Sequence, residues 1–164
     1  MLDDNQQRLL LTLEPDAYSG DVGTWAIVRA QTLWLRGDTA RARVYADSPH
    51  ITYAARTRAT PGDAQQYALG GLALAYLGRF PEAIAEGKRA VALAPVDANA
   101  SDGLYYLHEL ARIYLLAGQQ DKALDLLEPL LKLPYFLSAE WLRIDPALAP
   151  LRGNPRFEKL VAGA

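Results

Sequence analysis

The residues His108 and Glu109 begin like the zinc-peptidase motif, in which a second histidine follows the first by four positions on the same helix face. That position holds Arg112, so the motif is incomplete. The chain also has no glycine-flanked serine elbow and no calcium-binding loop with a central glycine. A catalytic site needs a nucleophile, a base and a group that orients the base, and the sequence offers no such set. It therefore predicts neither an enzyme nor a metal site.

The composition excludes several further classes of site and partner. Of the 164 residues, 51% are hydrophobic and 22% are charged, as is typical of a domain that folds in water. The absence of cysteine excludes disulfides, thiolate metal sites and cysteine nucleophiles. The 17 basic and 19 acidic side chains give a net charge of -2, which disfavours nucleic acid and anionic membranes as partners. We therefore expect no cofactor, no nucleic acid and no membrane association.

The sequence carries no pattern typical of export or membrane insertion. The longest apolar stretches, such as residues 69–77, are well below the roughly 20 residues that a membrane-spanning helix requires. The first residues lack the basic start and the apolar core of a secretory signal. We therefore expect a cytoplasmic protein.

Three segments of the chain follow one template. Each contains a glycine that closes an apolar helical run, and these glycines are Gly37, Gly78 and Gly118. A small residue lies seven positions before each glycine and an alanine five positions after it, namely Ala30, Gly71 and Ala111, and Ala42, Ala83 and Ala123. Two helices approach closely only where small side chains meet. The spacing therefore predicts three antiparallel helix pairs that cross at these residues.

The middle segment resembles a tetratricopeptide repeat throughout its length. Tyr67 stands at the large aromatic position of that family, Gly71 at the small position, Gly78 at the turn, and Ala83 and Pro95 at later positions of the pattern. The third segment keeps most of the pattern, and the first keeps less of it. The resemblance implies an all-α fold, in which antiparallel helix–turn–helix units form an α–α superhelix with a C-terminal helical cap.

The resemblance also divides residues 1–164, taken as a single domain, into five parts. These are a leading helix at 3–14, repeats at about 22–60, 63–95 and 102–134, and a cap at 137–162. The leading helix is expected to be the second helix of an earlier repeat, so that the chain is part of a longer array. Within the first repeat, Pro49 predicts either a kinked helix or a break, with Ser48 capping a new helix.

Several segments are together similar to the C-terminal repeat region of large bacterial signalling proteins. They are residues 4–11, 42–48, 104–114, 144–146 and 150–157. Such proteins carry a serine/threonine kinase, an adenylate cyclase or a DNA-binding regulator ahead of the repeats. The similarity implies a non-catalytic interaction or scaffold module with a protein or peptide partner, which can be intramolecular. A homodimerisation module is the alternative, and a small-molecule sensor, which needs an enclosed polar pocket, is a third possibility.

In tetratricopeptide arrays the first helices of successive repeats line a concave groove. The resemblance places eight residues there: Gln31, Trp34, Gln65, Leu72, Tyr76, Tyr105, His108 and Arg112. Trp34 and Leu72 are equally compatible with burial in the core. The two tyrosines, His108 and Arg112 are expected to be exposed, because tyrosine and arginine are enriched at binding hot spots.

One subgroup of the family uses polar groove residues to clamp the C-terminal carboxylate of a chaperone. In this chain Ala68 and Leu72 occupy positions where that clamp needs polar donors. An apolar and aromatic groove favours a peptide or helix with hydrophobic anchors. We therefore expect such a partner rather than a chaperone tail.

Overall fold

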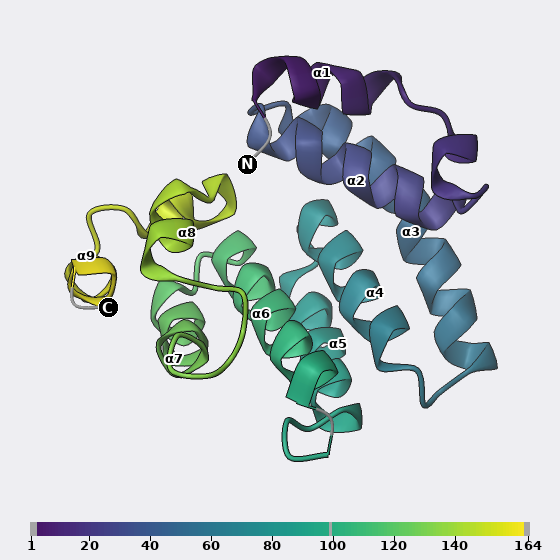
Figure 1. Cartoon of the computed structure of the whole chain (residues 1–164). Coiled ribbons are helices and arrows are strands. Elements are labelled where there is room, and N and C mark those ends of the chain that lie inside the picture. Colours follow the sequence, from purple (N-terminus) through teal and green to yellow (C-terminus); the bar gives the residue numbers. More distant parts are fainter. Residues whose placement is uncertain (1–2, 99, 163–164) are drawn as a thin grey trace.

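The chain is an all-α array in which neighbouring helices pack in antiparallel pairs (Figure 1). This computed structural model describes residues 3–98 and 100–162, and these residues contain no strand. The helices are α1 (Asp4–Thr12), the 3-10 helix η1 (Pro15–Tyr18), α2 (Val22–Leu35), α3 (Thr39–Ala59), α4 (Ala64–Leu77), α5 (Phe80–Leu93), α6 (Ala100–Leu116), α7 (Gln120–Leu130), α8 (Ala139–Ile144), the 3-10 helix η2 (Pro146–Leu151) and α9 (Pro155–Ala162). The predicted all-α fold is confirmed.

The turns within the pairs α2–α3, α4–α5 and α6–α7 share one conformation. Gly37, Gly78 and Gly118 have φ values of 81°, 83° and 71°, a left-handed conformation that favours glycine. The residue after each glycine donates its N–H to the carbonyl five positions earlier, over 2.8 or 2.9 Å. This is the pattern of a helix that ends on a left-handed glycine, so the three predicted turns are confirmed.

Small residues lie where the helices of these pairs cross. Ala30, Ala42, Ala83, Ala111 and Ala123 are completely buried, as the template predicts. A Cβ added to Gly71 would come within 2.9 Å of Ile113 Cδ1 on α6 and 3.0 Å of the Ala83 carbonyl oxygen on α5. Gly87, which the template did not single out, is equally crowded by Ile113 and Leu110. Glycine therefore lets α4, α5 and α6 pack at short distance.

Helix α3 continues through Pro49, which is buried inside it. The predicted break with Ser48 as a cap is therefore wrong, and of the two alternatives the helix that continues through Pro49 remains. Proline removes one backbone hydrogen bond from a helix. Helix α3 packs against both α2 and α4, and this burial offsets the loss.

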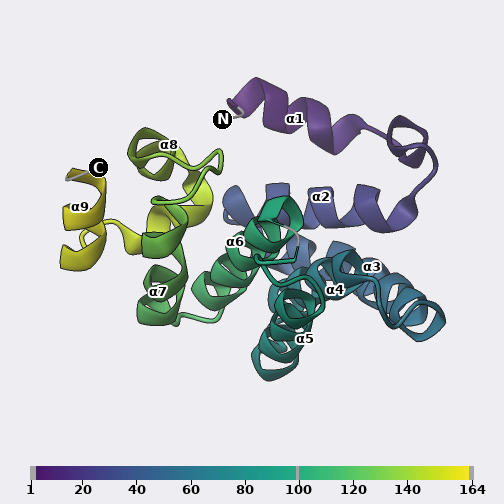
Figure 2. The same cartoon turned by 60° about the horizontal axis from the view of Figure 1, so that its bottom comes forward.

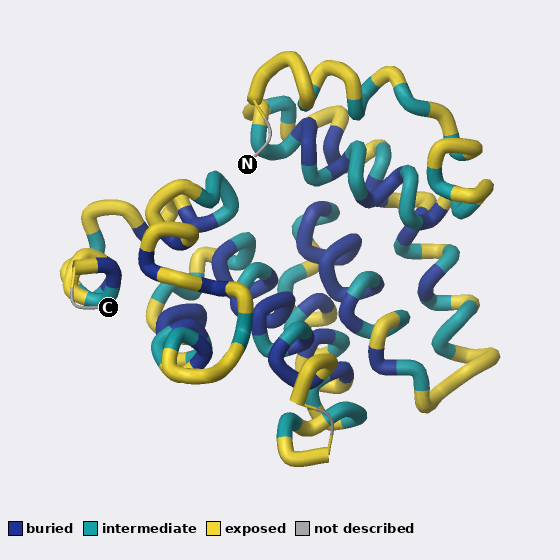
Figure 3. The backbone as a smooth tube through the Cα atoms, viewed as in Figure 1, coloured by how far each residue is buried: buried dark blue, intermediate teal, exposed yellow. Residues whose placement is uncertain are grey.

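The leading helix α1 lies along α2 at one edge of the array (Figures 1 and 2). Its first turn is held by Asp3 and Gln6, each of whose side chains accepts a hydrogen bond of 2.9 Å from the backbone N–H of the other. None of its residues is fully buried, so α1 is bound to the array by few contacts (Figure 3). An ion pair joins Asp4 to Arg36, and the Trp25 indole donates to the Leu13 carbonyl over 2.8 Å.

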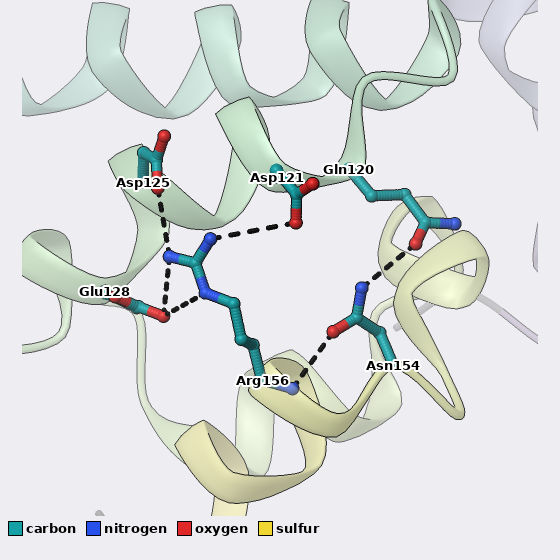
Figure 4. Close-up of polar contacts among 6 residues, drawn as sticks. All are labelled: Gln120, Asp121, Asp125, Glu128, Asn154 and Arg156. Carbon is teal, nitrogen blue, oxygen red and sulfur yellow. Dashed lines mark hydrogen bonds and ion pairs between the residues drawn. The ribbon is translucent and has the colours of Figure 1, made fainter.

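The C-terminal helix α9 covers the outer side of α7. Phe157 and Val161 are buried there, in the cluster that holds the apolar residues of α6 and α7. Arg156 lies among three carboxylates of α7, at 2.9 Å from Asp125, 3.0 Å from Glu128 and 3.7 Å from Asp121 (Figure 4). The buried side chains and this ion-pair network together fix α9 on the array.

Within the described part of the chain, no helix combines the length and the apolarity that crossing a membrane requires.

Candidate binding cavity

A cavity of about 410 Å³ lies between α2 and α6. Its two walls have the same spacing of lining residues. Helix α2 gives Val28, Gln31, Thr32 and Leu35, and α6 gives Tyr105, His108, Glu109 and Arg112. Residues three and four positions apart share one face of a helix, so each first helix presents one continuous face to the cavity.

The two ends of the chain complete the cavity. Helix α1 contributes Gln7 and Leu10, and the C-terminal segment, which turns back beside α6, contributes Phe136, Trp141, Ile144, Asp145, Pro146 and Ala147. Figures 1 and 2 show α1 next to α2 and the segment with α8 next to α6. Sequence reasoning missed these residues because they lie outside the repeating template. The exposed aromatic and apolar side chains of the C-terminal segment are a signal that could have indicated a binding role.

A smaller cavity of about 110 Å³ adjoins the first one. The two share the lining residues Gln31, Leu35, Arg112, Pro146 and Ala147. Trp34 and Tyr76 lie at the smaller cavity, with ring centroids 5.8 Å apart. The cavities together extend from α1 to the C-terminal end of α4, where Tyr76 lies. We call them the α2–α6 cavity.

The structure brings six of the eight predicted groove residues to the α2–α6 cavity. They are Gln31, Trp34, Tyr76, Tyr105, His108 and Arg112. Gln65 and Leu72 are not among its lining residues. Gln65 is exposed near the start of α4, whereas Leu72 is packed in the core between α2 and α4. For Leu72, therefore, the alternative of a core position is the correct one.

Four groove residues, the two tyrosines, His108 and Arg112, were predicted to be exposed, and this prediction is wrong for three of them. Tyr76 is 3% exposed and His108 6%, and the Arg112 side chain is 15% exposed. Tyr105 is half-buried. Tyr76 is packed in the core with residues of α2, α3, α5 and α6. His108 is covered by the C-terminal segment, because Tyr135 and Phe136 pack against its ring and η2 contacts α6.

Glu109 and Arg112 form an ion pair inside the α2–α6 cavity. The Nη1 atom of Arg112 lies 3.0 Å from both carboxylate oxygens of Glu109, whose side chain is 5% exposed. Burial works against the charge of Arg112, but the carboxylate of Glu109 beside it raises the pKa of Arg112 above its ordinary value. Arg112 therefore keeps its positive charge in this buried position.

His108 lies one turn before Arg112 on the same face of α6. Its Nδ1 atom is 3.4 Å from the hydroxyl of Tyr135, and its ring packs edge-on against Phe136. Burial lowers the pKa of His108, so the imidazole is neutral at neutral pH. Burial also raises the pKa of Tyr135 to about 12, so its hydroxyl keeps its proton and can donate it to Nδ1.

Two buried nitrogen atoms of the cavity have no hydrogen-bond partner among the described residues. They are Nη2 of Arg112 and Nε2 of His108. An unsatisfied buried polar group costs about 1–3 kcal/mol, and at a cavity wall a bound molecule can supply the missing partner. The hydroxyl of Thr32 donates its proton to the Val28 carbonyl over 2.8 Å. The arrangement is therefore suited to binding.

Among the described residues, no three histidine, aspartate or glutamate side chains gather in a way that could hold a metal ion. Comparisons of the chain with protein-family models, with curated proteins and with solved structures gave no match.

Proposed function

We propose that this chain is a non-catalytic protein-interaction module, similar to tetratricopeptide arrays, that binds a peptide segment in the α2–α6 cavity. The single observation that carries the proposal is the gathering of six predicted groove residues, from three helices, at one hollow. The resemblance of the sequence to the repeat region of bacterial signalling proteins favours a regulatory role in the cytoplasm. The segment can belong to another protein or to another part of the same signalling protein.

The dimensions of the cavity favour a short segment over a whole helix. Its volume of about 410 Å³ lies in the range of about 300–1,000 Å³ that is typical of small-ligand pockets. Most of its lining is apolar or aromatic, and two large side chains at it, Phe136 and Trp141, are 57% and 38% exposed. Exposed aromatic residues beside a pocket are common at protein interfaces. A peptide residue with a large apolar side chain fits this surface.

The test is a selection of displayed random peptides on the immobilised chain, followed by affinity measurements with three variants. Gln31→Trp fills the α2–α6 cavity from α2 and should abolish binding of the selected peptides. Gln65→Trp makes the same change at a predicted groove residue outside the cavity and should leave binding unchanged. Ile144→Trp fills the cavity from the other side, at a position that is 49% exposed and tolerates a larger side chain. Selected peptides that bind all four proteins equally, or a selection that yields none, would contradict the proposal.

Homodimerisation is a second candidate function, favoured by a separate surface. Val44 and Ile51 lie two turns apart on α3, and they are 72% and 60% exposed. A second copy of the chain could cover these side chains. Light scattering over a concentration series tests this candidate: a dimer that Val44→Lys and Ile51→Lys dissociate would support it, and a monomer at all concentrations would exclude it.

A further inference from the structure

We propose that the α2–α6 cavity recognises an uncharged carbonyl group next to a large apolar side chain, as a main-chain carbonyl of an extended peptide presents them. The carbonyl oxygen accepts hydrogen bonds from Arg112 and His108, and the side chain packs against Tyr105, Phe136 and Trp141. This inference rests on the proposed peptide-binding function and names the chemistry that the cavity selects.

Helix α6 presents two buried hydrogen-bond donors at the cavity. Nη1 of Arg112 is engaged by both oxygens of Glu109. The Tyr76 hydroxyl also lies near this guanidinium, but Nη2 has no acceptor in hydrogen-bond geometry among the described residues. A neutral imidazole carries one proton. The Tyr135 hydroxyl and Nδ1 of His108 are 3.4 Å apart, and we assign the hydroxyl as the donor of this hydrogen bond, which places the ring proton on Nε2. The cavity therefore holds two buried donors, one helical turn apart on α6, and both await an acceptor.

The charges at the cavity favour a neutral ligand. The charged side chains that line the larger cavity are Glu109, Arg112 and Asp145, so the carboxylates outnumber the guanidinium. A carboxylate or phosphate would be repelled by this surplus and would lose its hydration on entry. An ammonium group has no lone pair, so it cannot accept hydrogen bonds from the two donors. A neutral carbonyl satisfies both donors and adds no charge.

Aromatic residues lie beside these donors. The ring centroids of His108 and Phe136 are 5.6 Å apart, and those of Phe136 and Trp141 are 5.7 Å apart. The exposed edge of this cluster is apolar surface that a second apolar group can cover. In a peptide, a side chain and the carbonyl of the same residue are a few bonds apart. One aromatic or large aliphatic residue therefore reaches both features of the cavity.

The experiment is a ¹H–¹⁵N NMR titration with three probes that share a phenyl group. They are N-acetyl-phenylalanine amide, which is neutral, N-acetyl-phenylalanine, which is an anion, and phenethylamine, which is a cation. The indole N–H of Trp141 reports on the cavity, and that of Trp25, which bonds to Leu13 beyond it, is the internal control. The neutral amide should bind most tightly and shift the Trp141 signal without shifting that of Trp25.

Two variants test the donors. His108→Phe keeps an aromatic ring and removes Nε2, and the double variant Glu109→Leu with Arg112→Met removes the ion pair as a unit, so that no buried charge is left alone. Each should weaken binding of the amide by about tenfold or more, as expected for the loss of a hydrogen bond from a buried donor. Gln65→Ala should have no effect. If one variant does not fold, the other variant and the order of the three probes still decide the matter.

Three results would overturn the inference: an anion or cation that binds as tightly as the amide, an amide affinity unchanged in the folded variants, or no response of Trp141 to any probe. The selected peptides distinguish this failure from that of the proposed function. If the probes overturn carbonyl recognition but the selected peptides bind the chain and not Gln31→Trp, the proposed interaction function stands and only the inference about the carbonyl is wrong.

Discussion

At the scale of single residues, the ion pair of Glu109 and Arg112 determines how the α2–α6 cavity tolerates substitution. The side chains are 5% and 15% exposed, so removal of one leaves the other charged and buried without a partner. This costs about 3–5 kcal/mol, whereas apolar replacement of both partners is often nearly neutral. The two residues should therefore be strongly coupled.

We predict that Glu109→Leu lowers the free energy of unfolding by about 3 kcal/mol, and that adding Arg112→Met restores most of it. Urea denaturation of the two single variants, the double variant and the unmodified chain gives the coupling energy. Single variants whose losses simply add in the double variant would show that the pair is not coupled.

The neighbouring His108 makes the stability of the fold depend on pH. Burial lowers its pKa from the ordinary value of 6.5, and Arg112 acts in the same direction, whereas Glu109 and Asp145 oppose the shift. In the unfolded chain His108 takes up a proton near its ordinary pKa, but in the folded chain only at lower pH. The unfolded state therefore binds more protons than the folded state in this pH window. As the pH falls from about 6.5 through the depressed pKa, the free energy of unfolding decreases.

We predict that His108→Phe removes this part of the acid sensitivity. As the pH falls through that window, the unfolding free energy of the unmodified chain should decrease more than that of His108→Phe, because the phenyl ring cannot take up a proton. Urea denaturation of both proteins at several pH values between about 7.5 and about 5 measures the difference. Identical pH dependence in the two proteins would contradict the assignment of His108 as a buried neutral base.

The resemblance placed Tyr105, His108 and Arg112 in one groove, and their spacing of three and four positions puts them on one face of α6. It did not predict their burial, which depends on the distant segment around Phe136. Nor did it predict the ion pair with Glu109, because two residues three positions apart on a helix can point to water or toward each other.

At the scale of helices, the approach of α4 to its neighbours depends on glycine. A Cβ on Gly71 would meet the Ala83 carbonyl at 3.0 Å and the Gly87 nitrogen at 3.2 Å, and these backbone atoms cannot rotate away. A Cβ on the adjacent Gly70 would meet only Tyr53 Cβ, at an ordinary 3.4 Å. The two adjacent glycines are therefore a matched pair for testing the crossing.

We predict that Gly71→Ala lowers the free energy of unfolding by about 1–3 kcal/mol through overpacking. Gly70→Ala should be neutral or stabilising by up to about 1 kcal/mol, because alanine is the better helix former. Thermal or urea denaturation of both variants makes the comparison. Equal effects of the two substitutions would mean that α4 does not cross α5 and α6 at Gly71.

The docking of α9 offers a second contrast, between charged and apolar contacts. Arg156 contacts three carboxylates of α7, but its side chain is 40% exposed and water screens these contacts (Figure 4). Phe157 is 2% exposed in the core that α9 shares with α6 and α7. The apolar contact should therefore contribute most of the stability of this docking.

We predict that Phe157→Ala lowers the free energy of unfolding by about 3–5 kcal/mol, and that Arg156→Ala lowers it much less, because water screens its ion pairs. Urea denaturation at low and high salt separates the charged contribution from the apolar one, because only the effect of Arg156→Ala should shrink as salt is added. A larger loss from Arg156→Ala than from Phe157→Ala would reverse this account.

Sequence reasoning was most successful for helices at the turns and crossings, where a specific residue type is required. Gly78 needs a left-handed conformation, and Gly71 and Ala83 need a short distance between helices. It was least successful at Pro49, where the missing N–H of proline made a break in the helix one of two predicted outcomes. Packing of α3 on both sides offsets the lost hydrogen bond, and a pattern within one helix does not report such packing.

At the scale of the whole molecule, the cavity is a product of the repeating helices and of the segments that do not repeat. The repeating template supplies the walls on α2 and α6, whereas Leu10 of α1 and Trp141 of α8 close the ends. The α6 wall could largely be predicted, since Tyr105, His108 and Arg112 were expected in the groove, whereas on the α2 wall of the larger cavity only Gln31 was. The closure could not be predicted, since it depends on how two terminal segments fold back onto the array.

The central claim is that a peptide binds between these walls, and its most direct test locates a bound peptide on the chain. Nuclear Overhauser contacts between a selected peptide and the methyl groups of the protein give this location. We predict contacts to Val28 of α2 and Ile144 of α8 in the same complex, because both line the cavity. Contacts confined to Val44 and Ile51 on the outer face of α3, with none to Val28 or Ile144, would contradict the account.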